Sequence, residues 1–324
     1  MKILVTGGSG FIGTNLVADL LRNGHSVSIY DKTRSETYPD LCVVADVRDR
    51  ERLTEVLQGI DTVYHLAAEH RDDVHPVSLY YDVNVGGARN LVHAAEKNNV
   101  KRIMFTSSVA VYGLNASESN EDSPIRPFND YSKSKYQSEG LFNEWGQGDD
   151  SRCLVIVRPV VIFGEKNRGN VYELLSQIAS GKFVMVGNGK NEKSMAYVLN
   201  ISSFLAKLLE IGPGRHVYNY ADKPDMTVEE LVVTALKALG KEPKTKWRIP
   251  YAIGLFGGYT FDLIAGITGK TYPISSIRIK KFAADTKVSA ERLRKTGFSP
   301  PYSLADGLNR MIASEFLQNS DKTA

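Results

Sequence analysis

A tyrosine and a lysine four residues apart have the types and spacing that proton transfer requires. Tyr131 and Lys135 lie in the run Tyr-Ser-Lys-Ser-Lys, and on a helix this separation places both side chains on one face. A nearby ammonium favours the ionised form of a phenol and makes it a usable base near neutral pH. Ser108 follows an apolar run and adds a hydroxyl that can share a substrate oxygen, with Ser107 beside it as a substrate candidate. A hydrogen bond within a turn is the alternative for both serines.

A glycine-rich turn near the start of the chain predicts a dinucleotide site. Gly7, Gly10 and Gly13 follow a short apolar run, and Phe11 and Ile12 begin a helical pattern where cofactor contacts are expected. Glycine permits the tight turn and the close approach of backbone amides to a pyrophosphate, and the helix N-terminus offers its positive end. Because the strand, turn and helix occur in the required order, we prefer this interpretation to an ordinary glycine turn.

Two carboxylates after the next strands are expected to complete this site. Asp31 lies 18 residues after the last of these glycines, where it can accept hydrogen bonds from both ribose hydroxyls and repel a 2′-phosphate. Lys32 is also placed at the cofactor and can weaken that discrimination, but NAD is preferred to NADP. Asp46 and Val47 are expected near the adenine, and the alternative for Asp46 is capping of the helix that begins at Arg50.

Short apolar runs that alternate with helical patterns must position these residues. Six strands are predicted: Lys2–Thr6, Ser26–Tyr30, Leu41–Ala45, Thr62–His65, Arg102–Thr106 and Cys153–Arg158. Four helices are predicted between them: Phe11–Asn23, Arg50–Gln58, Val83–Asn98 and Tyr131–Trp145. This order indicates an α/β fold, a doubly wound parallel sheet of the Rossmann type. Residues 1–160 would form the cofactor domain, and residues 161–324 a smaller mixed α/β substrate domain, some of whose segments return to the sheet.

An almost uncharged segment within residues 249–295 has several interpretations. Ile249–Gly269 contains 21 residues with one charge, Asp262, together with Pro250 and five glycines. A helix of this length reaches about 31 Å, but a carboxylate near the bilayer centre costs about 2.5–3.5 kcal/mol or more, which argues against a membrane span. The remaining alternatives are a helix packed inside the smaller domain and a surface helix seated in the membrane interface.

The charge of the chain is uneven. Its 324 residues carry a net charge of +3, too small to indicate nucleic-acid binding. Residues 241–295 contain 12 basic and 4 acidic residues, a local charge of +8 around the apolar segment, so the remainder carries −5. Such a cluster favours contact with anionic lipid. Cys42 and Cys153 are far apart without metal-ligand neighbours, and no secretory signal pattern precedes the first apolar run. We therefore expect a cytoplasmic protein at the inner face of the cell membrane.

These motifs together resemble the extended short-chain dehydrogenase/reductases of the sugar-nucleotide epimerase/dehydratase type. The resemblance covers essentially the whole chain, including the late run Asp285–Leu293, and its members occur in the family's order: the glycines at 7, 10 and 13, His65-Leu-Ala-Ala68, Asn84, Ser108, and Tyr131 with Lys135.

The resemblance implies a role for each of these positions. Tyr131 is the catalytic base, and Lys135 lowers its pKa and holds the nicotinamide ribose. Ser108 is the hydroxyl partner of the substrate. The remaining cofactor contacts are Leu66, Ala67, Ala68 and Asn84. The aspartate and glutamate that dehydratases place after the catalytic hydroxyl are replaced by valine and alanine, which disfavours loss of water.

Longer runs are similar to the bacterial 4-epimerases that act on N-acetylglucosaminyl-diphospho-undecaprenol. These runs are Ala68-Glu-His-Arg-Asp-Asp73, Tyr80-Tyr-Asp-Val-Asn84, residues 158–170 and Lys193-Ser-Met-Ala-Tyr-Val198. Val160-Val161 and Lys193-Ser194 depart from the soluble UDP-sugar epimerases and put their usual uridine-diphosphate contacts in doubt. Basic candidates for the substrate diphosphate are Arg168, Lys193 and Arg278, with a solvated surface as the alternative for each.

This closer resemblance implies epimerisation at C4 through a 4-keto intermediate, with tightly held NAD and no net redox change. It gives O-antigen or lipopolysaccharide priming as the purpose, a lipid-linked sugar diphosphate as substrate, and a homodimer formed through the helices predicted at Val83–Asn98 and Tyr131–Trp145. A soluble UDP-sugar 4-epimerase and a net NAD-dependent dehydrogenase remain alternatives. An NAD-sensing module without turnover is the non-enzymatic alternative.

Overall fold

The chain folds into two compact units that are interleaved along the sequence. The computed structural model describes residues 1–71, 74–113, 118–243, 248–269 and 276–317. The first unit contains Met1–Ile162, Val198–Ala221 and Val288–Tyr302. The second unit contains Phe163–Tyr197, Asp222–Lys287 and Ser303–Ala324.

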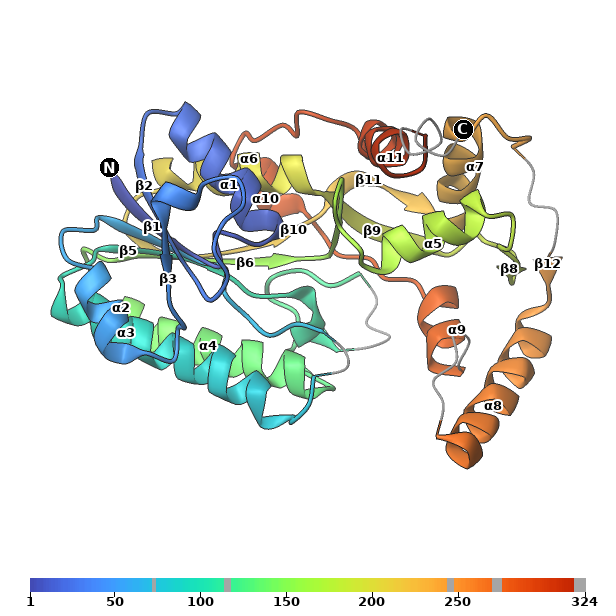
Figure 1. Ribbon diagram of the computed structural model, residues 1–324, viewed down its shortest axis with the longest axis horizontal. Coiled ribbons are helices and arrows are strands. Elements are labelled where there is room, and N and C mark those ends of the chain that lie inside the picture. Colours follow the sequence, from blue (N-terminus) through green and yellow to red (C-terminus); the bar gives the residue numbers. More distant parts are fainter. Residues whose placement is uncertain (72–73, 114–117, 244–247, 270–275, 318–324) are drawn as a thin grey trace. The chain divides into compact units, whose positions relative to one another are not determined.

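A seven-stranded parallel sheet forms the centre of the first unit (Figure 1). Its strand order is β10-β6-β5-β4-β1-β2-β3. The strands are β1 (Lys2–Thr6), β2 (Ser26–Asp31), β3 (Cys42–Val44), β4 (Thr62–His65), β5 (Arg102–Thr106), β6 (Cys153–Pro159) and β10 (Gly214–Tyr220). The strand order reverses between β1 and β4, and in such sheets the ligand crevice lies at the carboxyl ends of the strands beside the reversal. The predicted doubly wound sheet is therefore confirmed.

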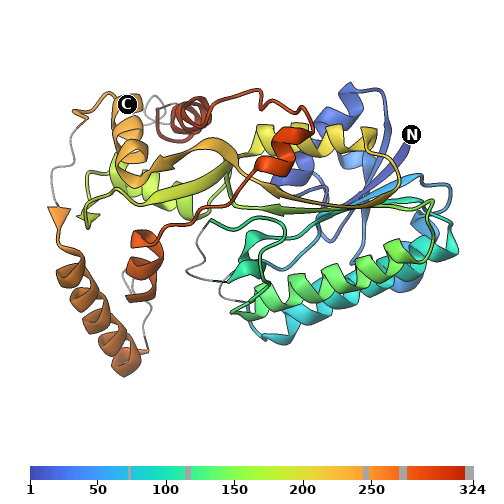
Figure 2. The ribbon, with the colours of Figure 1, turned by 180° about the vertical axis from the view of Figure 1, so that it is seen from behind.

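Helices cover both faces of this sheet (Figures 1 and 2). On one face α1 (Phe11–Arg22) packs against α6 (Val198–Lys207). On the other face lie α2 (Arg50–Val56), α3 (Gly87–Lys97) and α4 (Asp130–Gln147). The start of α4 is set by a capping box, in which the Asn129 side chain accepts a hydrogen bond from Ser132 N and the Ser132 hydroxyl reaches back to Asn129 N. This cap places Tyr131 in the first turn of α4.

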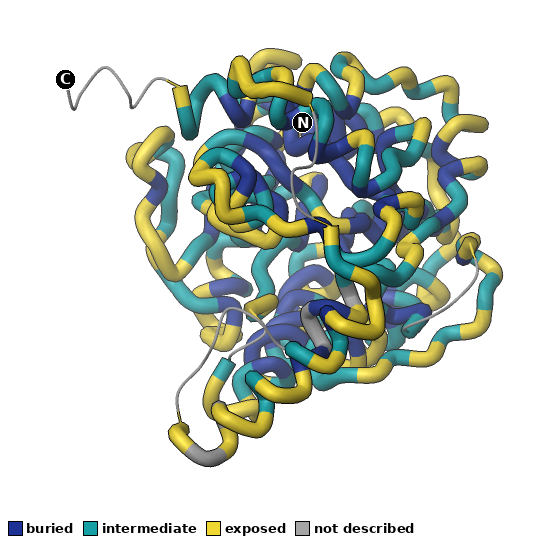
Figure 3. The backbone as a smooth tube through the Cα atoms, turned by 90° about the vertical axis from the view of Figure 1, so that its right-hand side faces the viewer, coloured by how far each residue is buried: buried dark blue, intermediate teal, exposed yellow. Residues whose placement is uncertain are grey.

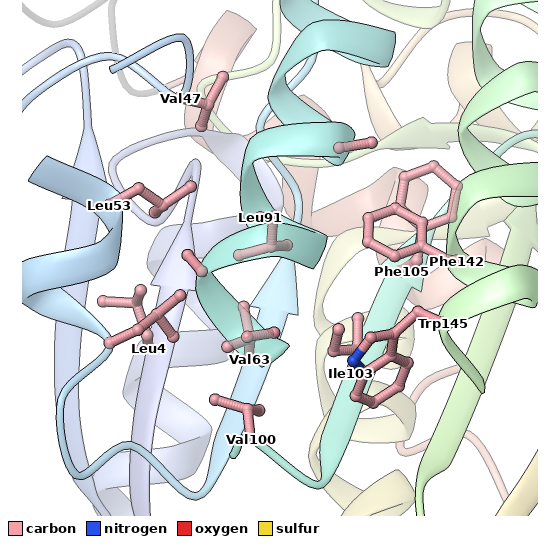
Figure 4. Close-up of a cluster of buried hydrophobic side chains, with 14 of the residues drawn as sticks. Leu4, Val47, Leu53, Val63, Leu91, Val100, Ile103, Phe105, Phe142 and Trp145 are labelled. Atoms are coloured by element: carbon pink, nitrogen blue, oxygen red, sulfur yellow. The ribbon is translucent and has the colours of Figure 1, made fainter. Parts of the chain in front are cut away.

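The main apolar core of the first unit lies between the sheet and these three helices (Figure 4). It consists of large aliphatic and aromatic side chains with almost no exposed surface, among them Leu4, Leu53, Val63, Leu91, Ile103, Phe105, Phe142 and Trp145. Phe105 and Phe142 are in tilted ring contact at 4.7 Å between centroids. Because Phe105 is on β5 and Phe142 on α4, their packing fixes α4 against the strand that leads to Ser108.

One predicted helix begins differently in the structure. Residues 80–86, at the start of the predicted Val83–Asn98 helix, form a π-helix, η2 (Tyr80–Gly86), and the α-helical part is α3. The carbonyl of Asn84 accepts a hydrogen bond from the Ser138 hydroxyl of α4 at 2.9 Å, and its side chain bonds to the loop after β4. These long-range hydrogen bonds compete with the backbone hydrogen bonds from residue i to residue i−4 that define an α-helix. Short π-helical segments of this kind often occur beside functional sites.

The second unit is a smaller mixed α/β structure, as predicted. Its strands form a three-stranded sheet of order β11-β9-β7 and a two-stranded sheet of β12 and β8. They are β7 (Val161–Phe163), where the chain enters this unit, β8 (Met185–Val186), β9 (Glu192–Tyr197), β11 (Asp222–Thr227) and β12 (Arg248–Ile249). Its helices are α5 (Asn170–Ala179), α7 (Val228–Ala238), α8 (Tyr251–Thr268), α9 (Ser276–Ala283), α11 (Leu304–Ile312) and the π-helix η5 (Ala313–Leu317).

Helix α8 carries the apolar segment and exposes one side of it. Ile253, Phe256 and Leu263 are 61%, 75% and 68% exposed, and α8 is largely exposed in Figure 3. The opposite side packs at Gly258, which lies against the start of α9, where an added Cβ would come within 2.8 Å of Ser276 Cα. The alternative of a helix packed in the smaller domain therefore holds for the side of Gly258 and does not account for the exposed side. Within the described ranges, no helix is long and apolar enough to cross a membrane.

Candidate active site

The glycine turn has the geometry that a dinucleotide requires. Gly7 has a φ of +73°, and an added Cβ there would lie 2.6 Å from the backbone nitrogen of Ala67. At Gly13 an added Cβ would lie 2.3 Å from the carbonyl oxygen of Gly7, so only glycine lets α1 approach the turn this closely. Gly10 caps α1 without a side-chain hydrogen bond, which leaves the amides of Phe11 and Ile12 in the first turn directed at an incoming phosphate.

Asp31 is held in one orientation at the end of β2. Its two carboxylate oxygens accept hydrogen bonds from the backbone nitrogens of Ser9, at 3.1 Å, and Thr33, at 3.0 Å. Lys32 turns instead to Glu69, with 2.6 Å between Lys32 Nζ and Glu69 Oε1. Lys32, one of the two basic residues that could accept a 2′-phosphate beside Arg34, is thus already paired, which supports the preference for NAD.

Asp46 lies beyond β3 and does not cap the next helix. The capping residue of α2 is Asp49, whose side chain accepts a hydrogen bond from Arg52 N at 3.0 Å, so the alternative role for Asp46 is wrong. Asp46 instead binds the Arg48 guanidinium, and this bond keeps the pKa of its carboxyl below the ordinary value. Val47 is buried against Gly87 at the start of α3.

The segment after β4 runs beside the glycine turn. Leu66, Ala67 and Ala68 are half-buried there, and the amides of Leu66 and Ala67 bond to the carbonyl and hydroxyl of Thr6 at 3.0 and 3.5 Å. His65 is buried, and its Nδ1 lies 2.7 Å from the Thr6 hydroxyl. Burial, together with the charge of Lys135, lowers the pKa of His65 to about 3, so its ring is neutral at physiological pH.

The side chain of Asn84, within η2, connects the loop after β4 to α4. Its amide Oδ1 accepts from Glu69 N at 2.8 Å, and its Nδ2 donates to the Glu69 carbonyl at 3.0 Å and to the Ser134 hydroxyl at 2.9 Å. These bonds use both amide hydrogens, so the side chain of Asn84 holds the loop after β4 against α4. Asn84 can therefore serve the predicted cofactor site by holding this loop in position, and its own contact with the cofactor stays a prediction.

Hydroxyl groups gather where β5 ends. Ser108 caps the short helix η3 (Val109–Tyr112), and its Oγ accepts a hydrogen bond from Ala110 N at 3.1 Å. Because the oxygen accepts this bond, the hydroxyl hydrogen remains available to a substrate oxygen. Thr106 and Ser107 are almost fully buried, and their hydroxyls bond to none of the described residues. A bound molecule would satisfy these groups, which suits a substrate site.

Tyr131 and Lys135 lie one turn apart on α4, as their spacing predicts. The ring of Tyr131 packs near Tyr80, with 6.4 Å between centroids. Lys135 is 3% exposed, and its ammonium lies 4.4 Å from the centroid of the Phe105 ring. Burial lowers the pKa of Lys135 to about 7, although the charge of Glu139 acts in the opposite direction. Because the two residues are one turn apart on the same helix face, the ammonium can approach the phenol, and such an approach would favour a phenolate base.

The predicted diphosphate contacts belong to the second unit. Arg168 pairs with Glu315, and its guanidinium lies 4.2 Å from the centroid of the Tyr172 ring. Lys193 donates to the carbonyl of Ala284, and burial lowers its pKa to about 8. The side chain of Arg278, on α9, lies outside the described residues, as do residues 270–275 of the predicted membrane-leaning region.

A buried polar group beside the site was not assigned from the sequence. Arg158 on β6 forms two hydrogen bonds to Glu139 on α4, with Nε to Oε1 at 2.9 Å and Nη2 to Oε2 at 2.6 Å. A third bond runs from Arg158 Nη1 to the Tyr112 hydroxyl at 2.8 Å. The four-residue step from Lys135 to Glu139 is the one signal that places this acid on the same helix face.

Comparison with known proteins gives consistent results. The family model described as the NAD dependent epimerase/dehydratase family matches residues 3–221. N-acetyl-alpha-D-glucosaminyl-diphospho-ditrans,octacis-undecaprenol 4-epimerase of Escherichia coli O157:H7 is 50% identical over 318 residues, which cover 98% of this chain and 96% of that protein.

Solved structures extend the likeness to the fold of the whole chain. A UDP-glucose 4-epimerase from Thermotoga maritima superposes with a TM-score of 0.77 at 21% identity over 99% of both chains. A UDP-N-acetylglucosamine 4-epimerase from Bacillus cereus has a TM-score of 0.76 at 19% identity, covering 97% of this chain and 99% of that chain.

Proposed function

The chain belongs to the NAD-dependent epimerase/dehydratase family, and on this premise we propose that it interconverts N-acetylglucosaminyl- and N-acetylgalactosaminyl-diphospho-undecaprenol. The observation that carries the proposal is the 50% identity to an enzyme named for the first of these lipids, over nearly the full length of both chains. The first unit would bind NAD and the second would cover the sugar diphosphate. Priming of O-antigen or lipopolysaccharide assembly is the use we assign to the product.

Three side chains of the first unit carry the proposed chemistry. Tyr131, as phenolate, takes the proton of the sugar 4-hydroxyl, and the Lys135 ammonium stabilises the phenolate charge. Ser108 donates a hydrogen bond to the same oxygen while it becomes a carbonyl. NAD held at the glycine turn and Asp31 would supply a hydride acceptor for C4 and, once the sugar has turned in the site, the same hydride for its opposite face, so the reaction would be redox-neutral. Tyr131 then gives its proton back to the C4 oxygen, which completes the C4 epimer and restores the phenolate of the enzyme.

Two side-by-side incubations test the substrate. Purified protein is given N-acetylglucosaminyl-diphospho-undecaprenol in detergent or UDP-N-acetylglucosamine in buffer, and the products are separated by chromatography. We expect the lipid-linked sugar to be epimerised without net consumption of NAD. Conversion of the UDP sugar alone would indicate a soluble sugar-nucleotide epimerase, and stoichiometric consumption of NAD would indicate a dehydrogenase.

The base is tested by removing one hydroxyl. Tyr131→Phe should lower turnover of the lipid-linked sugar by at least about 100-fold, within the usual contribution of acid–base catalysis. Tyr136→Phe is the matched control, because Tyr136 lies on the same helix and is 45% exposed. Full activity of Tyr131→Phe would refute the mechanism.

We also infer that α8 rests on an anionic membrane surface. Soluble proteins normally turn the apolar side of a helix inward, whereas Ile253, Phe256 and Leu263 are exposed. The single acid of the segment is turned to the protein, since Asp262 Oδ2 accepts a hydrogen bond from Ser276 N at 3.1 Å. Exposed Lys280 lies over the Tyr259 ring at 5.1 Å and adds positive charge beside this face. Apolar burial with electrostatic attraction is how interfacial helices bind.

Flotation with phospholipid vesicles tests this surface. The full chain should float with phosphatidylglycerol-containing vesicles, and Phe256→Asn/Leu263→Asn should lower the bound fraction at least about tenfold, because each side chain contributes about 1.5–3 kcal/mol of apolar burial. Val44→Asn is the control, because Val44 is an exposed apolar residue on the first unit. Equal binding by the double variant would contradict the assignment.

A homodimer through the outer sides of α3 and α4 completes the proposal. Arg89 and His93 of α3 and Tyr136 of α4 are exposed there. Exposed aromatic residues of this kind are typical of interfaces between proteins. Light scattering coupled to size exclusion should give twice the mass of one chain, and Tyr136→Glu should shift it toward one. A wild-type mass of one chain would refute the dimer.

A further inference from the structure

A buried guanidinium joins the two segments that carry the proposed catalytic groups. Arg158 and Glu139 are 3% and 1% exposed, and Tyr112, which receives the third hydrogen bond of Arg158, is 4% exposed. The Tyr112 hydroxyl in turn donates to Asn219 Oδ1 on β10 at 2.7 Å. Every polar atom of this linkage thus has a partner inside the first unit.

The two ends of the linkage lie on different elements of the site. Tyr112 is the last residue of η3, the short helix that Ser108 caps. Glu139 lies on α4, one turn after Lys135 and two turns after Tyr131. The guanidinium therefore connects the serine segment to the tyrosine and lysine helix through rigid, short elements.

Stability alone does not account for such a group. Replacing a buried ion pair by well-packed apolar side chains is often neutral or stabilising, so a buried pair is weak evidence of a stabilising role. The planar fork of arginine, however, fixes direction as well as distance when it binds a carboxylate with two parallel hydrogen bonds. Its two partners lie on the elements that carry Ser108 and Tyr131, so a fixed direction and distance between them would also fix the spacing of those elements.

We propose that Arg158 is a positioning residue, which sets the distance between the Ser108 hydroxyl and the Tyr131 and Lys135 side chains by binding Tyr112 and Glu139 together. The inference rests on the catalytic roles proposed above for these three groups. It predicts that loosening the linkage lowers the rate of the chemical step and leaves the binding of NAD and substrate in place, because a displacement of about 1 Å can cost about 100-fold in rate.

The mildest test removes the Tyr112 hydroxyl and keeps the ion pair. Tyr112→Phe should lower kcat at least about tenfold, with KM and the NAD content of the purified protein within twofold of wild type. Tyr64→Phe is the matched control, since Tyr64 is fully buried and its hydroxyl donates to the Leu205 carbonyl at 2.8 Å. Tyr112→Phe removes two buried hydrogen bonds, to Arg158 and Asn219, and Tyr64→Phe removes one, each worth about 1 kcal/mol of stability. A purely structural role would leave the kcat of both folded variants at the wild-type value. That result would overturn the proposal.

A double-mutant cycle isolates the linkage itself. Arg158→Lys keeps the charge opposite Glu139 but cannot make the forked contact to both partners, and it should also lower kcat about tenfold or more. Because Tyr112→Phe breaks the same link, the double variant should lose less than about twofold beyond Arg158→Lys alone. Independent, multiplying losses would contradict the shared role. If Tyr131→Phe stays active, the proposed mechanism itself fails. If Tyr131→Phe is inactive but Tyr112→Phe is fully active, the mechanism stands and only the positioning role of Arg158 is refuted.

Discussion

Replacing Lys135 by methionine should stabilise the cofactor-free protein near pH 7 and lose that effect as the pH rises. In the folded chain burial lowers the pKa of Lys135 to about 7, from 10.5. Between these values the unfolded chain binds one more proton than the folded chain, so the free energy of unfolding of the wild type rises with pH. The methionine side chain does not titrate, so the extra stability of Lys135→Met over wild type decreases over the same pH range.

The slope of that advantage follows from one proton. The difference in unfolding free energy between Lys135→Met and wild type should fall by about 1.4 kcal/mol for each pH unit, or about 3 kcal/mol between pH 7.5 and 9.5. All other groups titrate in both proteins, so their contributions cancel in the difference. The Glu139 carboxylate is paired with Arg158, and its charge offsets only part of the cost of burying the Lys135 ammonium.

Urea unfolding at four pH values measures this slope. Both proteins are stripped of NAD first, because a ligand bound to the folded state adds its own stabilisation. Lys133→Met is the control, since Lys133 is exposed on the same helix and its replacement should give a flat difference. If the difference in unfolding free energy between Lys135→Met and wild type did not change with pH, this would falsify the claim that burial lowers the pKa of Lys135.

Three further changes have defined outcomes. Gly13→Ala should abolish NAD retention, measured by cofactor content, because its Cβ would lie 2.3 Å from the Gly7 carbonyl oxygen; wild-type retention would contradict the close approach. Glu69→Gln should release Lys32 and lower the Kd for NADP relative to NAD by about 1.5- to 5-fold in a fluorescence titration, the size of one surface ion pair; an unchanged ratio would refute the pairing argument. Phe142→Ala should lower the free energy of unfolding by about 3–5 kcal/mol in urea, and a loss under 1 kcal/mol would mean that the core collapses around it.

The parts of the site that depend on neighbouring residues could be predicted from the sequence. The glycine turn, the start of α1 and the one-turn spacing of Tyr131 and Lys135 are local, since backbone sterics and helix geometry determine them within a few residues. The strands beside them are short apolar runs, and all six predicted strands agree with the structure within one residue at each end. The third is shorter at both ends, as Cys42–Val44.

The rest was decided by contacts between residues far apart in the sequence. Asn84 alters its own helix because it binds Glu69 and Ser134, 15 and 50 residues away. Asp262 turns inward because α9 offers it a backbone amide, which no hydropathy count can foresee.

In the sequence, nothing distinguishes Arg158 from other charged residues at the ends of strands. In the folded protein it is buried, because Glu139 and Tyr112 meet it from two other elements. Residues that lie close together in the sequence thus specify the base, its lysine and the nucleotide turn. Long-range packing specifies which buried charges neutralise one another and which side of α8 stays exposed, since burial and pairing depend on residues from many elements.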